Sequence, residues 1–165
     1  LIELVMVIVV VAVLAGIGVP LTIALMDSFD SAIYRKDLSA SAETCLRRLS
    51  REIPRLKNST SVLAAAASTY RFTDVDNNTI QYQLSGNNLQ RVYNGTIDTL
   101  ATNVFSLAFS YFKDDGSVIA APLVNPLQTN IRFVNLDLSF QSGGNTVNAT
   151  LKVVARNVLH TSDLF

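Results

Sequence analysis

The side chains that could do chemistry are few and lie far apart in the sequence. His160 is the only histidine, and without a second histidine or a cysteine nearby it is more typical of a solvated residue than of a zinc ligand or catalytic base. Residues 74–78 (DVDNN) begin like a calcium loop, but Thr79 stands where that loop needs glycine and Ser85 where it needs glutamate. The stretch therefore predicts a hairpin turn. We expect no catalytic residue, no cofactor and no metal, and we interpret the chain as not an enzyme.

Glu3 is the only charged residue before Asp27, and it lies at the edge of an apolar stretch, residues 4–26. A carboxylate at such an edge can sit among lipid head groups at little cost. If the apolar segment packs against copies of itself instead, Glu3 needs a positive partner, because an unpaired buried charge is strongly destabilising. No basic residue is within reach on the same helix, so the partner would be another chain or a terminal amine.

The apolar stretch itself predicts a membrane-spanning helix. Its residues would form about 35 Å of helix, enough for a hydrocarbon core of about 30 Å. A cleavable secretory signal is the alternative, but its apolar region usually has about 7–15 residues and follows basic residues. Gly16, Gly18 and Pro20 make the helix weakest there, although glycine and proline are also simply commoner in membrane helices.

A second helical pattern follows the apolar stretch. Apolar residues recur at spacings of three and four, the stripe of an amphipathic helix: Ala42, Cys45, Leu46, Leu49, Ile53 and Leu56. The opposite face is charged and includes two favourable four-residue pairs, Glu43 with Arg47 and Arg48 with Glu52. Cys45 is the only cysteine, which excludes an intrachain disulfide, and its place on the stripe predicts a buried thiol.

The two patterns join into a single helix. No glycine or proline occurs between Pro20 and Pro54, so we predict a helix from near Leu1 to about Ile53, ended by Pro54. The helix would be apolar on every side at first, and amphipathic later.

From Leu63 onward the hydrophobic period becomes two, which predicts β-strands. The alternating apolar positions are Ile80, Tyr82, Leu84; Phe105, Leu107, Phe109, Tyr111; Val134, Leu136, Leu138, Phe140; and Val147, Ala149, Leu151, Val153, Ala155. Turn signals separate these runs, so we predict an antiparallel meander of five or six strands with one apolar face, covered by the helix stripe. The predicted fold class is α+β: an apolar helix (1–26), its amphipathic continuation (27–57) and an antiparallel sheet domain (58–165).

Composition and charge exclude some functions. The chain is 49% hydrophobic and 16% charged, and all but five of its first 26 residues are hydrophobic, which disfavours a wholly soluble cytosolic enzyme. Its formal net charge is zero and it has no long run of lysine or arginine, so a nucleic-acid partner is not expected.

The opening LIELVMVIVVVAVLAGIGVP resembles the amino-terminal helix of the type IV pilin family, which includes type IV pilins and the pseudopilins of type II secretion systems. In that family a prepilin peptidase removes a short basic leader, and the mature chain begins with a methylated residue shortly before LIEL. The resemblance implies that such a leader precedes Leu1 and that the sheet domain lies outside the inner membrane. It matches the family's glutamate with Glu3 and its helix-breaking proline with Pro20.

The resemblance also implies how these residues would act. Glu3 would pair with the terminal amine of a neighbouring subunit, and the stretch from Gly16 through Gly18 to Pro20 would lose helical structure when subunits pack in a filament. Later segments (SREIPRLKNSTSV, YRFTDVDNNTIQYQLSGNNLQRV and NVFSLAFSYF) are similar to minor pseudopilins of the J type and to minor pilins. Many major pilins close a carboxy-terminal loop with two cysteines, and this chain has one.

Three hypotheses follow. The leading one is a structural subunit of a type IV pilus-like filament, held in the inner membrane before assembly and in an extracellular or periplasmic filament afterwards. Its partners would be copies of itself or other pilin-like subunits, together with the assembly machinery. The alternatives are a minor pseudopilin of a type II secretion system and a monomeric, single-pass membrane-anchored binding module.

Overall fold

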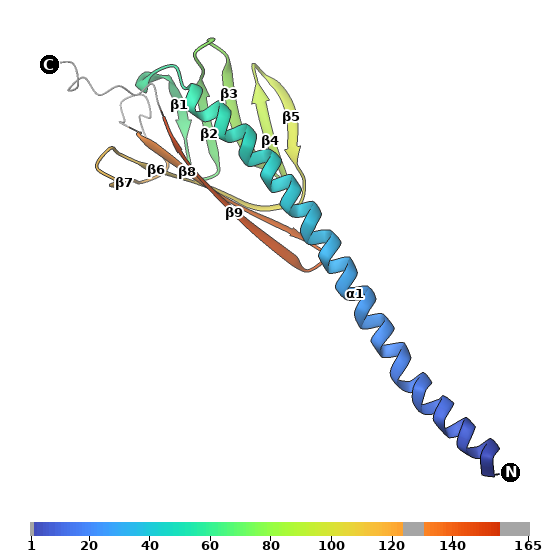
Figure 1. Ribbon diagram of the computed structural model, residues 1–165. Coiled ribbons are helices and arrows are strands. Elements are labelled where there is room, and N and C mark those ends of the chain that lie inside the picture. Colours follow the sequence, from blue (N-terminus) through green and yellow to red (C-terminus); the bar gives the residue numbers. More distant parts are fainter. Residues whose placement is uncertain (1, 124–130, 156–165) are drawn as a thin grey trace.

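The computed structural model describes residues 2–123 and 131–155, and it contains one long helix whose carboxyl-terminal part packs on two β-sheets (Figure 1). Helix α1 (Ile2–Glu52) runs without interruption for 51 residues. At about 1.5 Å per residue it is about 77 Å long. A short 3₁₀ helix, η1 (Ile53–Arg55), contains Pro54 and ends α1. The predicted single helix and its termination at Pro54 are confirmed.

Nine strands form two antiparallel sheets in the described part of the chain. After η2 (Ser59–Ser61), the first sheet has the order β1-β2-β3-β4-β5: β1 (Val62–Ala65), β2 (Thr69–Thr73), β3 (Thr79–Ser85), β4 (Asn88–Tyr93) and β5 (Thr96–Ala101). The second has the order β7-β6-β8-β9: β6 (Val104–Phe112), β7 (Val118–Ile119), β8 (Phe133–Ser142) and β9 (Asn145–Val154). The α+β architecture with a long amino-terminal helix is as predicted.

The core lies where α1 meets both sheets. Five of the six stripe residues are buried, Leu46 is half-buried, and α1 packs against β5, β8 and β9. Tyr70 on β2 joins the two sheets, since its ring centroid lies 5.7 Å from those of both Phe109 and Tyr111 on β6. These contacts bury both apolar sheet faces against each other and the helix.

The prediction of one meander of five or six strands is wrong. The chain leaves the first sheet after β5, at Asn103, whose φ of 60° turns the backbone away. Strand β6 then pairs with β7 and β8, not with β5. Alternation of apolar residues identifies the side of a strand that is buried but not the strand it pairs with, so it could not separate one sheet from two.

The predicted inward position of Phe105 is also wrong. Its side chain is 68% exposed, whereas Val104 is fully buried. The pairing of β6 with β8 shifts register between Val104 and Ser106, and such a bulge moves one residue to the other face. Beyond the bulge, Leu107 and the residues that alternate with it are buried as predicted.

Tyr70 supplies a stability prediction. Its hydroxyl oxygen is buried and has no hydrogen-bond partner among the described residues, whereas the Tyr111 hydroxyl donates to the carbonyl of Ala66 at 2.8 Å. Because an unsatisfied buried polar group is unfavourable, Tyr70→Phe should leave the free energy of unfolding unchanged or raise it by about 1 kcal/mol. The matched variant Tyr111→Phe should lower it by about 1 kcal/mol. Urea unfolding of both variants checks this, and a clear loss of stability in Tyr70→Phe would contradict it.

Candidate functional site

Residues 2–33 of α1, called the stalk below, project away from the sheets (Figure 1). The large hydrophobic side chains described in the stalk are all more than half exposed. The helix is long and apolar enough to cross a membrane. Where it reaches the domain, Arg35 donates to the side-chain oxygen of Asn145 at 3.1 Å. The stalk is therefore an extended apolar surface that the rest of the described chain leaves uncovered.

Glu3 lies in the first turn of α1, at the far end of the stalk, and its side chain is exposed. A carboxylate there complements the positive end of the helix dipole. The nearest basic residue along the helix is Arg35, which is about 48 Å away at 1.5 Å per residue. Any cation that pairs with Glu3 must therefore come from outside the described residues.

Gly16, Gly18 and Pro20 lie in the middle of the stalk, and α1 is continuous through them. Pro20 has no backbone N–H, so the Gly16 carbonyl lacks its usual helical donor. A Cβ atom added at either glycine would meet nothing within 4 Å, helix backbone apart. Packing within the described chain therefore does not require glycine at these positions.

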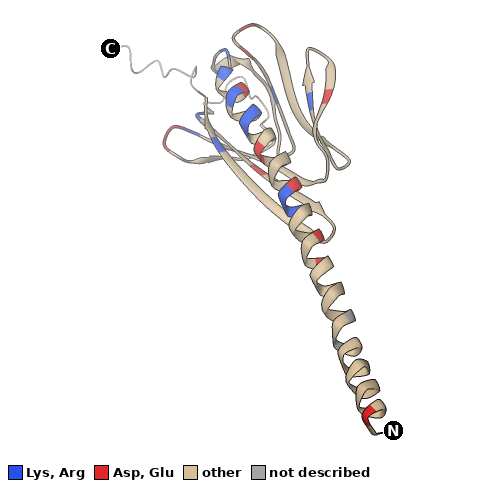
Figure 2. Cartoon of the chain, turned by 45° about the vertical axis from the view of Figure 1, so that its right-hand side comes forward, with Lys and Arg blue, Asp and Glu red and all other residues tan. Residues whose placement is uncertain are grey.

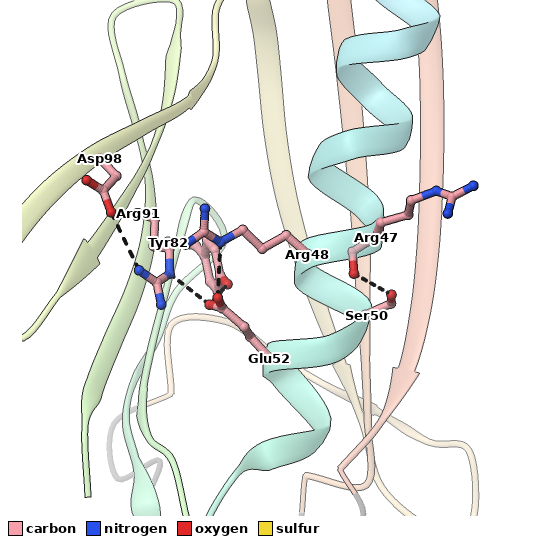
Figure 3. Close-up of polar contacts among 7 residues, drawn as sticks. All are labelled: Arg47, Arg48, Ser50, Glu52, Tyr82, Arg91 and Asp98. Carbon is pink, nitrogen blue, oxygen red and sulfur yellow. Dashed lines mark hydrogen bonds and ion pairs between the residues drawn. The ribbon is translucent and has the colours of Figure 1, made fainter. Parts of the chain in front are cut away.

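A polar cluster joins the end of α1 to the first sheet (Figure 3). The Nε atom of Arg91, on β4, donates to Oε2 of Glu52 at 2.8 Å, and the Tyr82 hydroxyl, on β3, donates to the same oxygen. Arg48 donates to the other oxygen at 3.1 Å. A second acid, the half-exposed Asp98, has its Oδ2 atom 3.6 Å from Nη1 of Arg91. Arg91 and Glu52 side chains are only 8% and 16% exposed, so this ion pair is largely desolvated.

The environment of Glu52 keeps its carboxylate ionised. Burial by itself would raise the pKa of this carboxyl, but hydrogen bonds from Arg91, Tyr82 and Arg48 outweigh it and hold the pKa below its ordinary value. Burial, reinforced by Glu52, raises the pKa of the Tyr82 hydroxyl, so it stays a donor. The cluster thus anchors the helix end to the sheet.

The sequence predicts Glu52 only as a residue of the charged helix face and Tyr82 only as an alternating strand residue, and it predicts no role for Arg91. The predicted pairs Glu43–Arg47 and Arg48–Glu52 are confirmed. The signal that was available is that Arg91 alternates with Leu89 on the inward side of a strand, where a charged residue needs a buried partner.

The remaining candidate residues from the sequence are Cys45, the turn that begins at Asp74, and His160. Cys45 is buried as predicted, and burial raises the pKa of its thiol to about 11. Asp74 accepts backbone N–H groups of Asp76 and Asn78 in the turn between β2 and β3, which confirms the predicted hairpin. His160 lies outside the described residues. Within residues 2–123 and 131–155, no group of three or more His, Cys, Asp or Glu side chains is placed to hold a metal ion.

No protein-family model matches the chain, and no curated protein matches it.

Proposed function

We propose that this chain is a structural subunit of a type IV pilus-like filament, which assembles through the stalk. The observation that carries the proposal is the exposed stalk, which is uncharged over residues 4–26 and continuous with the helix that holds the sheet domain, with the acid Glu3 at its far end. The likeness of residues 1–20 to the type IV pilin helix supports it.

The continuity of α1 favours a filament subunit over a simple membrane anchor. An anchor needs only about 20 apolar residues and tolerates a flexible linker to its domain. Here one helix leads from Ile2 to Glu52 and is fastened to the sheet by the Glu52 cluster. A rigid connection of this kind would fix the position of the domain relative to a bundle of packed stalks.

Before assembly the stalk would lie in the inner membrane, and a prepilin peptidase would remove the leader. In the filament, the stalks would cover one another in the interior, and the sheet domains would form the outer coat in the periplasm or outside the cell. Glu3 would pair with the terminal amine of a neighbouring subunit, because an acid buried among stalks needs a cation.

Electron microscopy of sheared surface material, with mass spectrometry of the mature amino terminus, tests this proposal. Filaments that contain the chain, with a cut leader and a methylated first residue, are expected. A bulk pilin would be their main component, whereas a minor pilin or a pseudopilin would be scarce and found with partner subunits. A chain that stays monomeric in detergent, with no filament in the cell, would instead identify the membrane-anchored binding module.

The stretch from Gly16 to Pro20 gives a prediction about assembly. The double variant Gly16→Ala, Gly18→Ala should strengthen the helix by about 1 kcal/mol per site, because alanine is the better helix former. Circular dichroism in detergent should show unchanged or higher helicity, while filament yield should fall because the stretch unwinds less readily. Val11→Ala, outside this stretch, is the control. Filament yield equal to that of the unmodified chain would contradict the prediction.

A further inference from the structure

Two aspartates at the end of the stalk have no ionic partner in the described chain. Asp27 and Asp30 are exposed, and neither carboxylate takes part in a hydrogen bond or ion pair among the described residues. Positions three and four residues away on either side hold no lysine or arginine. Figure 2 shows acidic segments where the stalk ends and mostly basic ones farther along the helix.

The basic end of α1 and the adjoining η1 form an open groove of about 530 Å³, lined by side chains of these two helices alone: Thr44, Arg47, Arg48, Arg51, Glu52 and Arg55. Three of these arginines have acidic partners: Arg47 with Glu43, Arg48 with Glu52, and Arg55 with Asp76. Arg51 has none within the part of the chain that the structure describes. The groove therefore holds more positive charge than its own acids neutralise, which favours an acidic occupant.

Each of the two aspartates has an arginine at the same distance farther along the helix. Asp27 and Arg48 are 21 residues apart, and so are Asp30 and Arg51. At about 1.5 Å per residue, a single displacement of about 32 Å along the axis aligns both aspartates with both arginines. We propose that Asp27 and Asp30 of one copy pair with Arg48 and Arg51 of a second copy displaced by this amount. This inference rests on the proposed filament function and adds the contact between its subunits.

A second copy suits the groove better than other acidic partners for two reasons. At this displacement residues 2–12 of the copy that offers the aspartates lie opposite residues 23–33 of the other copy, so exposed apolar stalk surface is covered as well as charge. The pairing is also heterologous, because each copy offers aspartates to one neighbour and arginines to another. Each contact moves the next copy about 32 Å in the same direction, so the series cannot close into a ring. A repeated displacement along one direction produces an open filament, and a stalk that is apolar on all sides allows neighbours on several sides.

Charge reversal tests the pairing in cells that assemble the unmodified chain. Arg51→Glu should lower filament yield about tenfold, because repulsion replaces attraction at every contact. Asp30→Arg in the same chain should restore the yield, since every contact then holds the pair in reverse. Asp37→Arg is the matched control for the rescue and should not restore the yield of Arg51→Glu, because no basic residue lies 21 positions beyond Asp37. Lys36→Glu is the control for Arg51→Glu, because it also replaces a basic residue of the helix by an acid.

Crosslinking detects the contact between Asp30 of one copy and Arg51 of the next directly, without using filament yield as the readout. In the double variant Asp30→Cys, Arg51→Cys, a short bismaleimide should join copies into a ladder of crosslinked oligomers. The control double variant Asp37→Cys, Arg51→Cys should give no such ladder. Cys45 can be kept, because it is buried. Normal filaments from Arg51→Glu, failure of Asp30→Arg to rescue, or equal ladders from both cysteine pairs would overturn the pairing. Rescue failure would point to a lipid head group or a different acidic protein. Absence of filaments from the unmodified chain would overturn the proposed function itself.

Discussion

Replacing Glu3 by alanine is expected to abolish filament assembly while leaving the chain in the membrane. The variant keeps the whole apolar stretch, so its membrane insertion should not change. In the proposed filament, however, the partner amine of the neighbouring subunit would be left buried without an anion. Removing one member of a buried ion pair costs about 3–5 kcal/mol, which corresponds to a loss of more than about a hundredfold in the association constant for each subunit.

The measurement is the ratio of sheared filament to membrane-bound subunit, determined by immunoblotting and electron microscopy. Asp37→Ala is the control, because it removes an exposed acid from the same helix beyond the apolar stretch. Glu3→Gln, which keeps the shape of the side chain but not its charge, should fail like Glu3→Ala. Normal filaments from either Glu3 variant would show that the acid has no part in assembly.

The second large effect is expected on the stability of the domain, from Arg91→Met. This change leaves the Glu52 carboxylate, only 16% exposed, without its strongest cation, and should lower the free energy of unfolding by about 3–5 kcal/mol. Asp98→Ala is the matched control, because it removes the other acid near Arg91. The Asp98 side chain is 51% exposed, so its loss should lower the free energy of unfolding by less than about 1 kcal/mol. The chain has no tryptophan, so urea unfolding in detergent should be followed by the near-ultraviolet circular dichroism of its tyrosines. Equal losses in the two variants would contradict this account.

The same cluster predicts how stability depends on pH. The folded chain holds the pKa of Glu52 below its ordinary value, so this carboxylate contributes stability above the pKa of the unfolded chain. That contribution is lost as pH falls through the lower, folded pKa. The difference in unfolding free energy between the unmodified chain and Glu52→Gln should therefore be constant near neutral pH and narrow below about pH 4.5. If this difference in unfolding free energy stayed the same down to pH 3, the stabilising role of the ionised Glu52 carboxylate would be contradicted.

Local sequence patterns were sufficient for the helix and for the stalk. The uncharged stretch after Glu3, the three-and-four spacing that includes Cys45 and Leu49, and the stop at Pro54 all concern residues within a few turns of one another. Helical periodicity is set by neighbours along the chain, so it can be deduced without knowing the rest of the fold. The isolation of Glu3 from any cation followed from the same local information.

Only the tertiary structure decided which distant residues meet. Glu52 and Arg91 lie 39 positions apart, and their pairing depends on where β4 passes the end of α1. The exposure of Phe105 depends on a register shift against β8, and the division into two sheets depends on which strands exchange hydrogen bonds. The sequence of a strand determines its alternation, but its register and partner come from packing between segments far apart in the chain.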